Sequence, residues 1–261
     1  MTEPGTQGNA RSWFAHYKPN PDARLRLFCF PYAGGSAQTY RRWSESLPGI
    51  EVFPVQLPGR GSRLFEPLFT DHLTTIDAIA GAIQPYLDKP FALFGHSLGG
   101  LIAFELAHLL LDSQGLSPTH FLVSSHRAPH LPNTDRKVHD LPEDELIQEI
   151  IRLNGTPQQV LDSPELMQMV LPLIRADFQI YEEYAYSQHP KLNCPISVYG
   201  GLDDSCVNRD QLQEWAQHTN GKFSMKMMPG DHFFIHTSER ELLHSIYQEL
   251  AQTSGATARP I

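Results

Sequence analysis

Short apolar segments recur along the chain and alternate with longer segments in which apolar residues have helical spacing. The apolar segments are Leu25–Phe30, Val52–Val55, Phe91–Phe94, Phe121–Ser124, Ile196–Tyr199 and Phe223–Met227. Several are almost continuously apolar, which is typical of strands buried on both faces of a parallel sheet. The alternation predicts right-handed strand–helix–strand crossovers, and therefore an α/β fold with a mostly parallel central sheet flanked by helices.

Helical patterns occupy most of the intervals between these strands. The predicted helices are Ser36–Leu47, Thr70–Leu87, Leu98–Leu111, Asn208–His218 and Ser238–Gln252. The two ends of the chain, residues 1–20 and 252–261, lack periodicity and are rich in Gly, Pro, Thr, Ser and Ala. We expect both ends to be disordered tails around a single domain at residues 21–251.

The alternation stops between about residues 130 and 188, where no strand pattern is present. Helices are predicted instead at Leu141–Leu153, from Ser163 onward, and at Leu173–Tyr186. The run Ser163-Pro164-Glu165 has the residue types of an N-cap, a first helical position and an acidic first turn. A helical insertion between two strands of an α/β sheet is a candidate lid. The alternative is a helical subdomain that only enlarges the core; the motif described next favours the lid.

A G-x-S-x-G motif lies between one predicted strand and the helix that follows it. The sequence Gly95-His96-Ser97-Leu98-Gly99 has an apolar strand before it and an apolar helix after it, which is the context that a nucleophile elbow requires. The backbone turns sharply at Ser97, so its neighbours two positions away must be small. We therefore predict Ser97 as a nucleophile at a helix N-terminus, where developing negative charge is stabilised. The alternative is a tight turn with a structural serine.

A serine nucleophile needs a base, and the chain offers thirteen histidines. In this kind of fold the base follows the last strand. The last strand pattern is followed by Pro229-Gly230-Asp231-His232, so we predict His232 as the base and His236 as structural. The acid should follow an earlier strand, and Asp203 and Asp204 both do. The backbone N–H groups of Leu98 and of Ala33, in the Gly-rich loop after the first strand, are the predicted oxyanion donors. The alternative for this loop is that Gly34-Gly35 only permits a tight strand-to-helix turn.

Composition and charge narrow the class of protein further. The chain has 261 residues, and its net charge of −9 argues against nucleic acid as a partner. No segment resembles a signal peptide or reaches the roughly 20 apolar residues of a membrane span. Three cysteines without a C-x-x-C pair fit a reducing compartment. We expect a cytoplasmic, monomeric protein that does not act at a membrane and, lacking metal and nucleotide motifs, uses no metal or cofactor.

Several longer motifs extend from about Phe28 to Leu250. They are Phe30-Pro31-Tyr32-Ala33-Gly34-Gly35, Gln56-Leu57-Pro58-Gly59-Arg60-Gly61-Ser62-Arg63, Gly95-His96-Ser97-Leu98-Gly99-Gly100, His126-Arg127-Ala128-Pro129, Leu171-Pro172-Leu173-Ile174-Arg175-Ala176-Asp177-Phe178, the turn Gly200–Asp204, and Gly230-Asp231-His232-Phe233. With these motifs the chain resembles the type II (editing) thioesterases that accompany polyketide synthases and nonribosomal peptide synthetases. The Pro-Gly-Arg-Gly-x-Arg and Arg-Ala-Asp-Phe pieces separate this family from lipases and general esterases.

The resemblance implies an α/β-hydrolase that removes aberrant or stalled acyl groups from the phosphopantetheine arm of an acyl or peptidyl carrier protein. The family's acid follows Gly-Gly-x-x, which favours Asp204 over Asp203, although Ser205 stands where relatives often have proline. His126 stands where relatives often have glycine or arginine. The alternatives are a product-releasing or medium-chain acyl-carrier-protein thioesterase, a general esterase, and a catalytically idle carrier-binding module.

Carrier proteins of this kind are usually acidic, and so is this chain. Net repulsion would slow their encounter, so we expect a local basic patch at the docking surface. The candidates for that patch are Arg41, Arg42, Arg60, Arg63, Arg136 and Lys137. For each of them the alternative is a solvated side chain or a structural ion pair.

Overall fold

The computed structural model describes residues 12–254, and residues 1–11 and 255–261 lie outside the described part. The central sheet has the strands β1 (Leu25–Phe30), β2 (Ile50–Pro54), β3 (Phe91–His96), β4 (His120–Ser124), β5 (Ile196–Gly201) and β6 (Phe223–Met228). Their order is β2-β1-β3-β4-β5-β6, and every neighbouring pair is parallel. The predicted α/β fold is confirmed, and each predicted strand is present within two residues of its expected ends.

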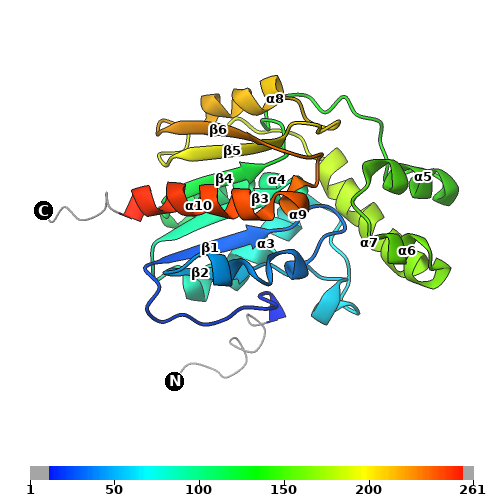
Figure 1. The fold of residues 1–261 in the computed structure, drawn as a ribbon, viewed down its shortest axis with the longest axis horizontal. Coiled ribbons are helices and arrows are strands. Elements are labelled where there is room, and N and C mark those ends of the chain that lie inside the picture. The colour runs from blue at the N-terminus through cyan, green and yellow to red at the C-terminus, as the bar shows by residue number, and fades with distance from the viewer. Residues whose placement is uncertain (1–11, 255–261) are drawn as a thin grey trace, which may run out of the picture.

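Helices cover both faces of this sheet (Figure 1). On one face, α3 (His72–Ile83) and α4 (Leu98–Gln114) pack over a cluster that contains Phe28 of β1. On the other face, α2 (Trp43–Ser46) and α10 (Glu239–Ser254) pack over a second cluster that contains Leu27 and Cys29. Alternate residues of one strand thus enter opposite cores, which explains the continuously apolar segments in the sequence.

The remaining helices connect the strands or form the insertion. The predicted helix Ser36–Leu47 is divided into the 3₁₀ turn Ala37–Tyr40 and α2, and the predicted helix Asn208–His218 into α8 (Arg209–Gln213) and a 3₁₀ turn. Further 3₁₀ turns lie at Gly61–Arg63 and Gln84–Tyr86, and α9 (Phe234–Thr237) precedes α10. No helix between residues 12 and 254 combines the length and apolarity needed to span a bilayer.

The prediction of a disordered N-terminal tail is wrong for residues 12–20. Trp13 and Phe14 are buried in the core, where the Phe14 ring meets the Phe53 ring edge-on at 5.2 Å. The guanidinium of Arg63 stacks on the Trp13 ring at 3.8 Å. Because these two aromatic rings are buried, residues 12–20 pack against the domain, although their composition is typical of a disordered tail. At the other end α10 continues to Ser254, three residues into the predicted C-terminal tail.

The helical insertion consists of α5 (Glu143–Leu153), α6 (Gln158–Leu161) and α7 (Pro164–Glu182), which form a group at one end of the sheet (Figure 1). Ser163 caps α7 as predicted, since its side chain accepts a hydrogen bond from the Leu166 N–H. The two predicted helices in this region form one continuous helix, because α7 accommodates Pro172 in its interior. Proline removes one helical hydrogen bond, but its neighbours Leu171 and Leu173 are buried and hold the helix together.

Candidate active site

Ser97 lies at a strained turn between β3 and α4. Its φ of 52° and ψ of −122° are far from helical or extended values, and such strain in a non-glycine residue is typical of functional positions. A Cβ atom on Gly95 would lie 2.1 Å from the Gly99 carbonyl oxygen, and one on Gly99 would lie 2.1 Å from the Phe30 carbonyl oxygen. Both positions therefore accept only glycine, which is the steric requirement expected around the elbow.

Asp204 and His232 are in direct contact. His232 Nδ1 lies 3.0 Å and 3.1 Å from the two carboxylate oxygens of Asp204. The carboxylate also accepts hydrogen bonds from the Ser125 hydroxyl at 2.9 Å and from the backbone N–H groups of Cys206 at 2.8 Å and Val207 at 3.1 Å. Burial would raise the pKa of Asp204, but the interactions with His232 and the other donors outweigh it and lower this pKa. Asp204 is thus held as a carboxylate.

Asp203 and His236, the neighbouring acid and histidine, do not form such a pair. Asp203 is exposed on the same turn, and its backbone N–H donates a hydrogen bond of 3.0 Å to the Gly230 carbonyl. His236 Nε2 lies 2.8 Å from the Tyr32 hydroxyl, and burial lowers the pKa of its imidazole. Sequence reasoning missed Ser125, whose hydroxyl orients Asp204. Its signal is weak, because Ser125 is distinguished only by following a strand at the edge where the other side chains meet.

The candidate oxyanion donors lie on two different elements. Leu98 is the first residue of α4, where a helix leaves its N–H groups without partners inside the helix. Ala33 belongs to a turn after β1, closed by a hydrogen bond of 2.8 Å from the Gly35 N–H to the Tyr32 carbonyl. Gly34 in this turn has a φ of +76°, a conformation that favours glycine. Both Ala33 and Leu98 line the same cavity as Ser97 and His232.

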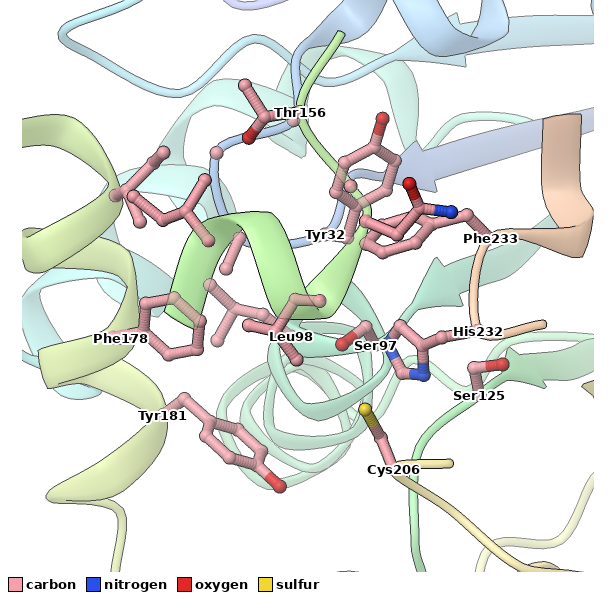
Figure 2. A pocket seen from close by; sticks show the side chains of 18 of the residues that line it. Tyr32, Ser97, Leu98, Ser125, Thr156, Phe178, Tyr181, Cys206, His232 and Phe233 are labelled. Atoms are coloured by element: carbon pink, nitrogen blue, oxygen red, sulfur yellow. The ribbon is translucent and has the colours of Figure 1, made fainter. Parts of the chain in front are cut away.

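The cavity has a volume of about 880 Å³ and extends from Ser97 to the helical insertion. Figure 2 shows Ser97 and His232 at one wall and Phe178 and Tyr181 of α7 at another. Apolar side chains that line it include Ile150, Val160, Val170 and Ile174 of the insertion, and Val138 just before it. A cavity of this size with a few polar groups is typical of a binding site for an organic molecule.

Comparisons with known proteins agree with this geometry. The sequence matches the thioesterase domain family over residues 25–250. This chain belongs to the thioesterase family. Thioesterase PikA5 of Streptomyces venezuelae is 36% identical to it, over 98% of this chain and 92% of the relative. The solved type II thioesterase BorB from the borrelidin biosynthetic cluster is 37% identical, with a TM-score of 0.83 over 93% of this chain and 98% of that one.

A further relative is named as a dehydrogenase and not as a thioesterase. Linear gramicidin dehydrogenase LgrE of Brevibacillus parabrevis is 42% identical, over 91% of this chain and 92% of the relative. The family match of the present chain is nevertheless to a thioesterase domain, and its sequence contains no G-x-G-x-x-G nucleotide-binding motif. The predicted thioester hydrolase, and its resemblance to type II thioesterases of polyketide and nonribosomal peptide pathways, are therefore confirmed.

The prediction that Arg60 and Arg63 belong to a carrier-docking patch is wrong. The Arg60 side chain is only 5% exposed and forms a two-point ion pair with Asp177, with both N–O distances at 2.7 Å. The Arg63 side chain is 4% exposed, pairs with Glu66 and stacks on Trp13. Neither guanidinium can meet a partner protein at the surface. Arg41 and Arg42 are exposed and line the cavity of the thioesterase, so they stay candidates.

One group of side chains in the described part of the thioesterase has the spacing of a metal site. Ligand atoms of Asp204, Cys206 and His232 lie within 4.8 Å of one another. In this arrangement, however, His232 Nδ1 and Asp204 already satisfy each other by hydrogen bonding. The geometry is therefore that of an acid that orients an imidazole, as two members of a catalytic triad do.

Proposed function

We propose that the protein hydrolyses acyl thioesters on the phosphopantetheine arm of acyl or peptidyl carrier proteins, and so removes aberrant or stalled acyl units in polyketide or nonribosomal peptide biosynthesis. The observation that carries this proposal is the Asp204–His232 pair at the wall of a cavity that also holds the strained Ser97. The names of the relatives support the biosynthetic setting. The apolar cavity beneath the insertion, which we interpret as a lid, suits an acyl chain.

In the proposed mechanism Ser97 attacks the thioester carbonyl while His232 accepts the hydroxyl proton. The N–H groups of Leu98 and Ala33 stabilise the oxyanion of the tetrahedral intermediate. The imidazolium of His232, stabilised by Asp204, then protonates the leaving pantetheine sulfur and leaves an acyl group on Ser97. A water molecule that gives a proton to His232 hydrolyses this acyl-serine and restores the enzyme.

A panel of acyl groups loaded on one carrier protein tests the proposal. Each acyl-carrier protein is incubated with the enzyme and followed by intact mass, with Ser97→Ala as the matched blank. We expect rapid loss of many short acyl groups from the wild type, and acylated carrier that persists with Ser97→Ala. Substantial turnover by Ser97→Ala would contradict the assignment of the nucleophile.

The same panel separates editing from product release. An editing enzyme removes many short acyl groups at similar rates, whereas a product-releasing or medium-chain thioesterase prefers one long chain. The cavity volume of about 880 Å³ would also accommodate a longer chain, which is the observation in favour of this second candidate. If the enzyme hydrolyses one long acyl group far faster than all the others, the product-releasing or medium-chain thioesterase is the correct assignment.

Arg41 and Arg42 are the proposed contacts for an acidic carrier protein. Both are exposed and line the cavity, and their positive charge would locally oppose the repulsion that the chain's net charge of −9 causes. We expect Arg41→Glu with Arg42→Glu to lower kcat/KM for acyl-carrier protein but not for the same acyl group on free pantetheine. Arg209→Glu, at an exposed arginine of α8 outside the cavity lining, is the control. Equal losses with both substrates would argue against docking at this patch.

A further inference from the structure

Arg60 and Asp177 belong to two sequence motifs that have no role in the proposed chemistry, and their side chains form a buried ion pair. Arg60 follows β2, and Asp177 lies on α7 of the insertion, 117 positions along the chain. The two side chains are 5% and 1% exposed. Burying two charges costs several kcal/mol per ion unless the geometry is excellent, so such a pair is weak evidence for a role in stability alone. The other hydrogen bonds of Arg60 and Asp177 show which part of the structure the pair is attached to.

Both members of the pair bind the turn that carries Ala33. Asp177 Oδ2 accepts a hydrogen bond of 2.7 Å from the Gly34 N–H. Arg60 Nη1 donates one of 3.0 Å to the Gly35 carbonyl. The turn is thus fastened through one donor and one acceptor by two side chains that are themselves bound to each other at two points. Ile174, one turn before Asp177 on α7, also lies against Gly34, since its Cγ1 is 3.1 Å from where a Cβ would be.

The hydrogen bond within the turn fixes the direction of the Ala33 N–H. Because the Tyr32 carbonyl accepts the Gly35 N–H at 2.8 Å, it points into the turn. In a planar trans peptide the following N–H points the opposite way, so the Ala33 N–H points out of the turn. Its direction therefore depends on the turn itself, and its position relative to Ser97 depends on what the turn is anchored to. That anchor is the pair Arg60–Asp177.

We propose that Arg60 and Asp177 are positioning residues that hold the Ala33 N–H where the oxyanion forms, and that they tie this donor to the helical insertion. This inference rests on the proposed roles of Ala33 and Leu98. Displacement of an oxyanion donor affects the transition state and leaves binding of the ground-state thioester almost unchanged. An error of about 1 Å in such a position can lower the rate by about 10²-fold.

The test uses Asp177→Asn and Arg60→Lys, each of which keeps a polar side chain but loses the two-point pairing. The control is Arg26→Lys. Arg26 also forms a buried pair, with Glu51 at 2.9 Å, but it lies near the start of β1 and outside the cavity lining. A merely structural pair predicts similar effects of all three substitutions on stability and kcat. The positioning role predicts that only the first two lower kcat.

Kinetics and two inhibitors of acyl-pantetheine form provide the readout. We expect Asp177→Asn and Arg60→Lys to lower kcat by about 10- to 100-fold with little change in KM. A trifluoromethyl ketone, which adds the serine hydroxyl and places an oxyanion in the hole, should lose affinity by a similar factor. A thioether without the carbonyl should bind as before. Near-ultraviolet circular dichroism confirms that each variant is folded, and Arg60→Lys carries the test if Asp177→Asn does not fold.

Two results would overturn the inference in distinguishable ways. If the wild type binds the trifluoromethyl ketone no more tightly than the thioether, the proposed oxyanion hole is wrong, and the positioning role with it. If the wild type discriminates between the two inhibitors and the folded Arg60 and Asp177 variants discriminate equally well, the hole stands and the positioning role is wrong. A loss of kcat equal to that of Arg26→Lys would also overturn it.

Discussion

The carboxyl edge of the sheet and the helical insertion build the same cavity with opposite kinds of packing. At the sheet edge, Gly95 and Gly99 leave no room for a single added carbon atom. The insertion has its own small core, which includes Leu146 and Ile150, and it leaves Met169 of α7 53% exposed. The rigid edge suits groups that must keep their geometry during a reaction. The insertion contributes apolar side chains to the cavity lining and therefore suits adjustment of which acyl group fits.

The largest expected effect of a single substitution at the sheet edge is that of Asp204→Asn. An asparagine keeps the shape but stabilises the wrong tautomer of His232, and in a comparable triad this lowered kcat by about 10⁴-fold. We expect a loss of that order with an almost unchanged melting temperature. Asp203→Asn, on the exposed neighbour, is the control and should keep nearly full activity. A large loss with Asp203→Asn and a small one with Asp204→Asn would exchange their assignments.

The second expected effect concerns the packing of that edge. Gly99→Ala would place a Cβ atom 2.1 Å from the Phe30 carbonyl oxygen, and backbone cannot yield as a flexible side chain does. We expect a loss of about 3 kcal/mol or more in the free energy of unfolding, measured by urea titration. Gly81→Ala is the matched control, because nothing lies within 4 Å of a Cβ on Gly81 in α3.

Alanine is the better helix former, so Gly81→Ala should stabilise the protein by up to about 1 kcal/mol. If Gly99→Ala were as stable as Gly81→Ala, the contrast between a rigid edge and an adjustable insertion would not hold.

The sequence predicted the rigid edge better than it predicted the insertion. Strands buried on both faces and the glycines beside Ser97 have strong signals, because few residue types satisfy those positions. Arg60 and Arg63 were misassigned because charged side chains are usually exposed, and no local pattern shows that Asp177 closes on Arg60 from 117 positions away. Two helices were predicted where the structure has only α7, because tertiary packing keeps this helix continuous across Pro172.

A third prediction tests the adjustable side of the comparison. Phe178 of α7 lines the cavity (Figure 2), so Phe178→Ala enlarges the space for an acyl chain. We expect kcat/KM to shift toward longer chains by about 10-fold, in keeping with the 1–3 kcal/mol that a small change in an apolar pocket contributes. Met169→Ala, on the same helix but outside the cavity lining, should leave the chain-length profile unchanged. A profile that changes equally in both variants would mean that the insertion acts as a whole.

The smallest expected effect concerns His108 of α4, at the junction between this helix and His189, which follows the insertion. Its ring stacks on His189 at 4.2 Å, and neither of its nitrogens has a hydrogen-bond partner among residues 12–254. Burial, followed by the nearby His189 and His218, lowers the pKa of His108 to about 3. Between the ordinary value of about 6.5 and this value the unfolded chain binds a proton that the folded chain does not.

Stability should therefore fall as the pH decreases through this window, and His108 contributes up to about 1.4 kcal/mol per pH unit to the slope. We expect His108→Leu to lose less stability than the wild type between about pH 6.5 and pH 4, as measured by urea titration at several pH values. His244→Gln, at an exposed histidine of α10, is the control and should follow the wild type. Equal slopes for His108→Leu and the wild type would mean that this junction opens and admits water, so that His108 binds its proton in the folded chain as it does in the unfolded chain. The limit of the rigid region would then lie closer to Ser97.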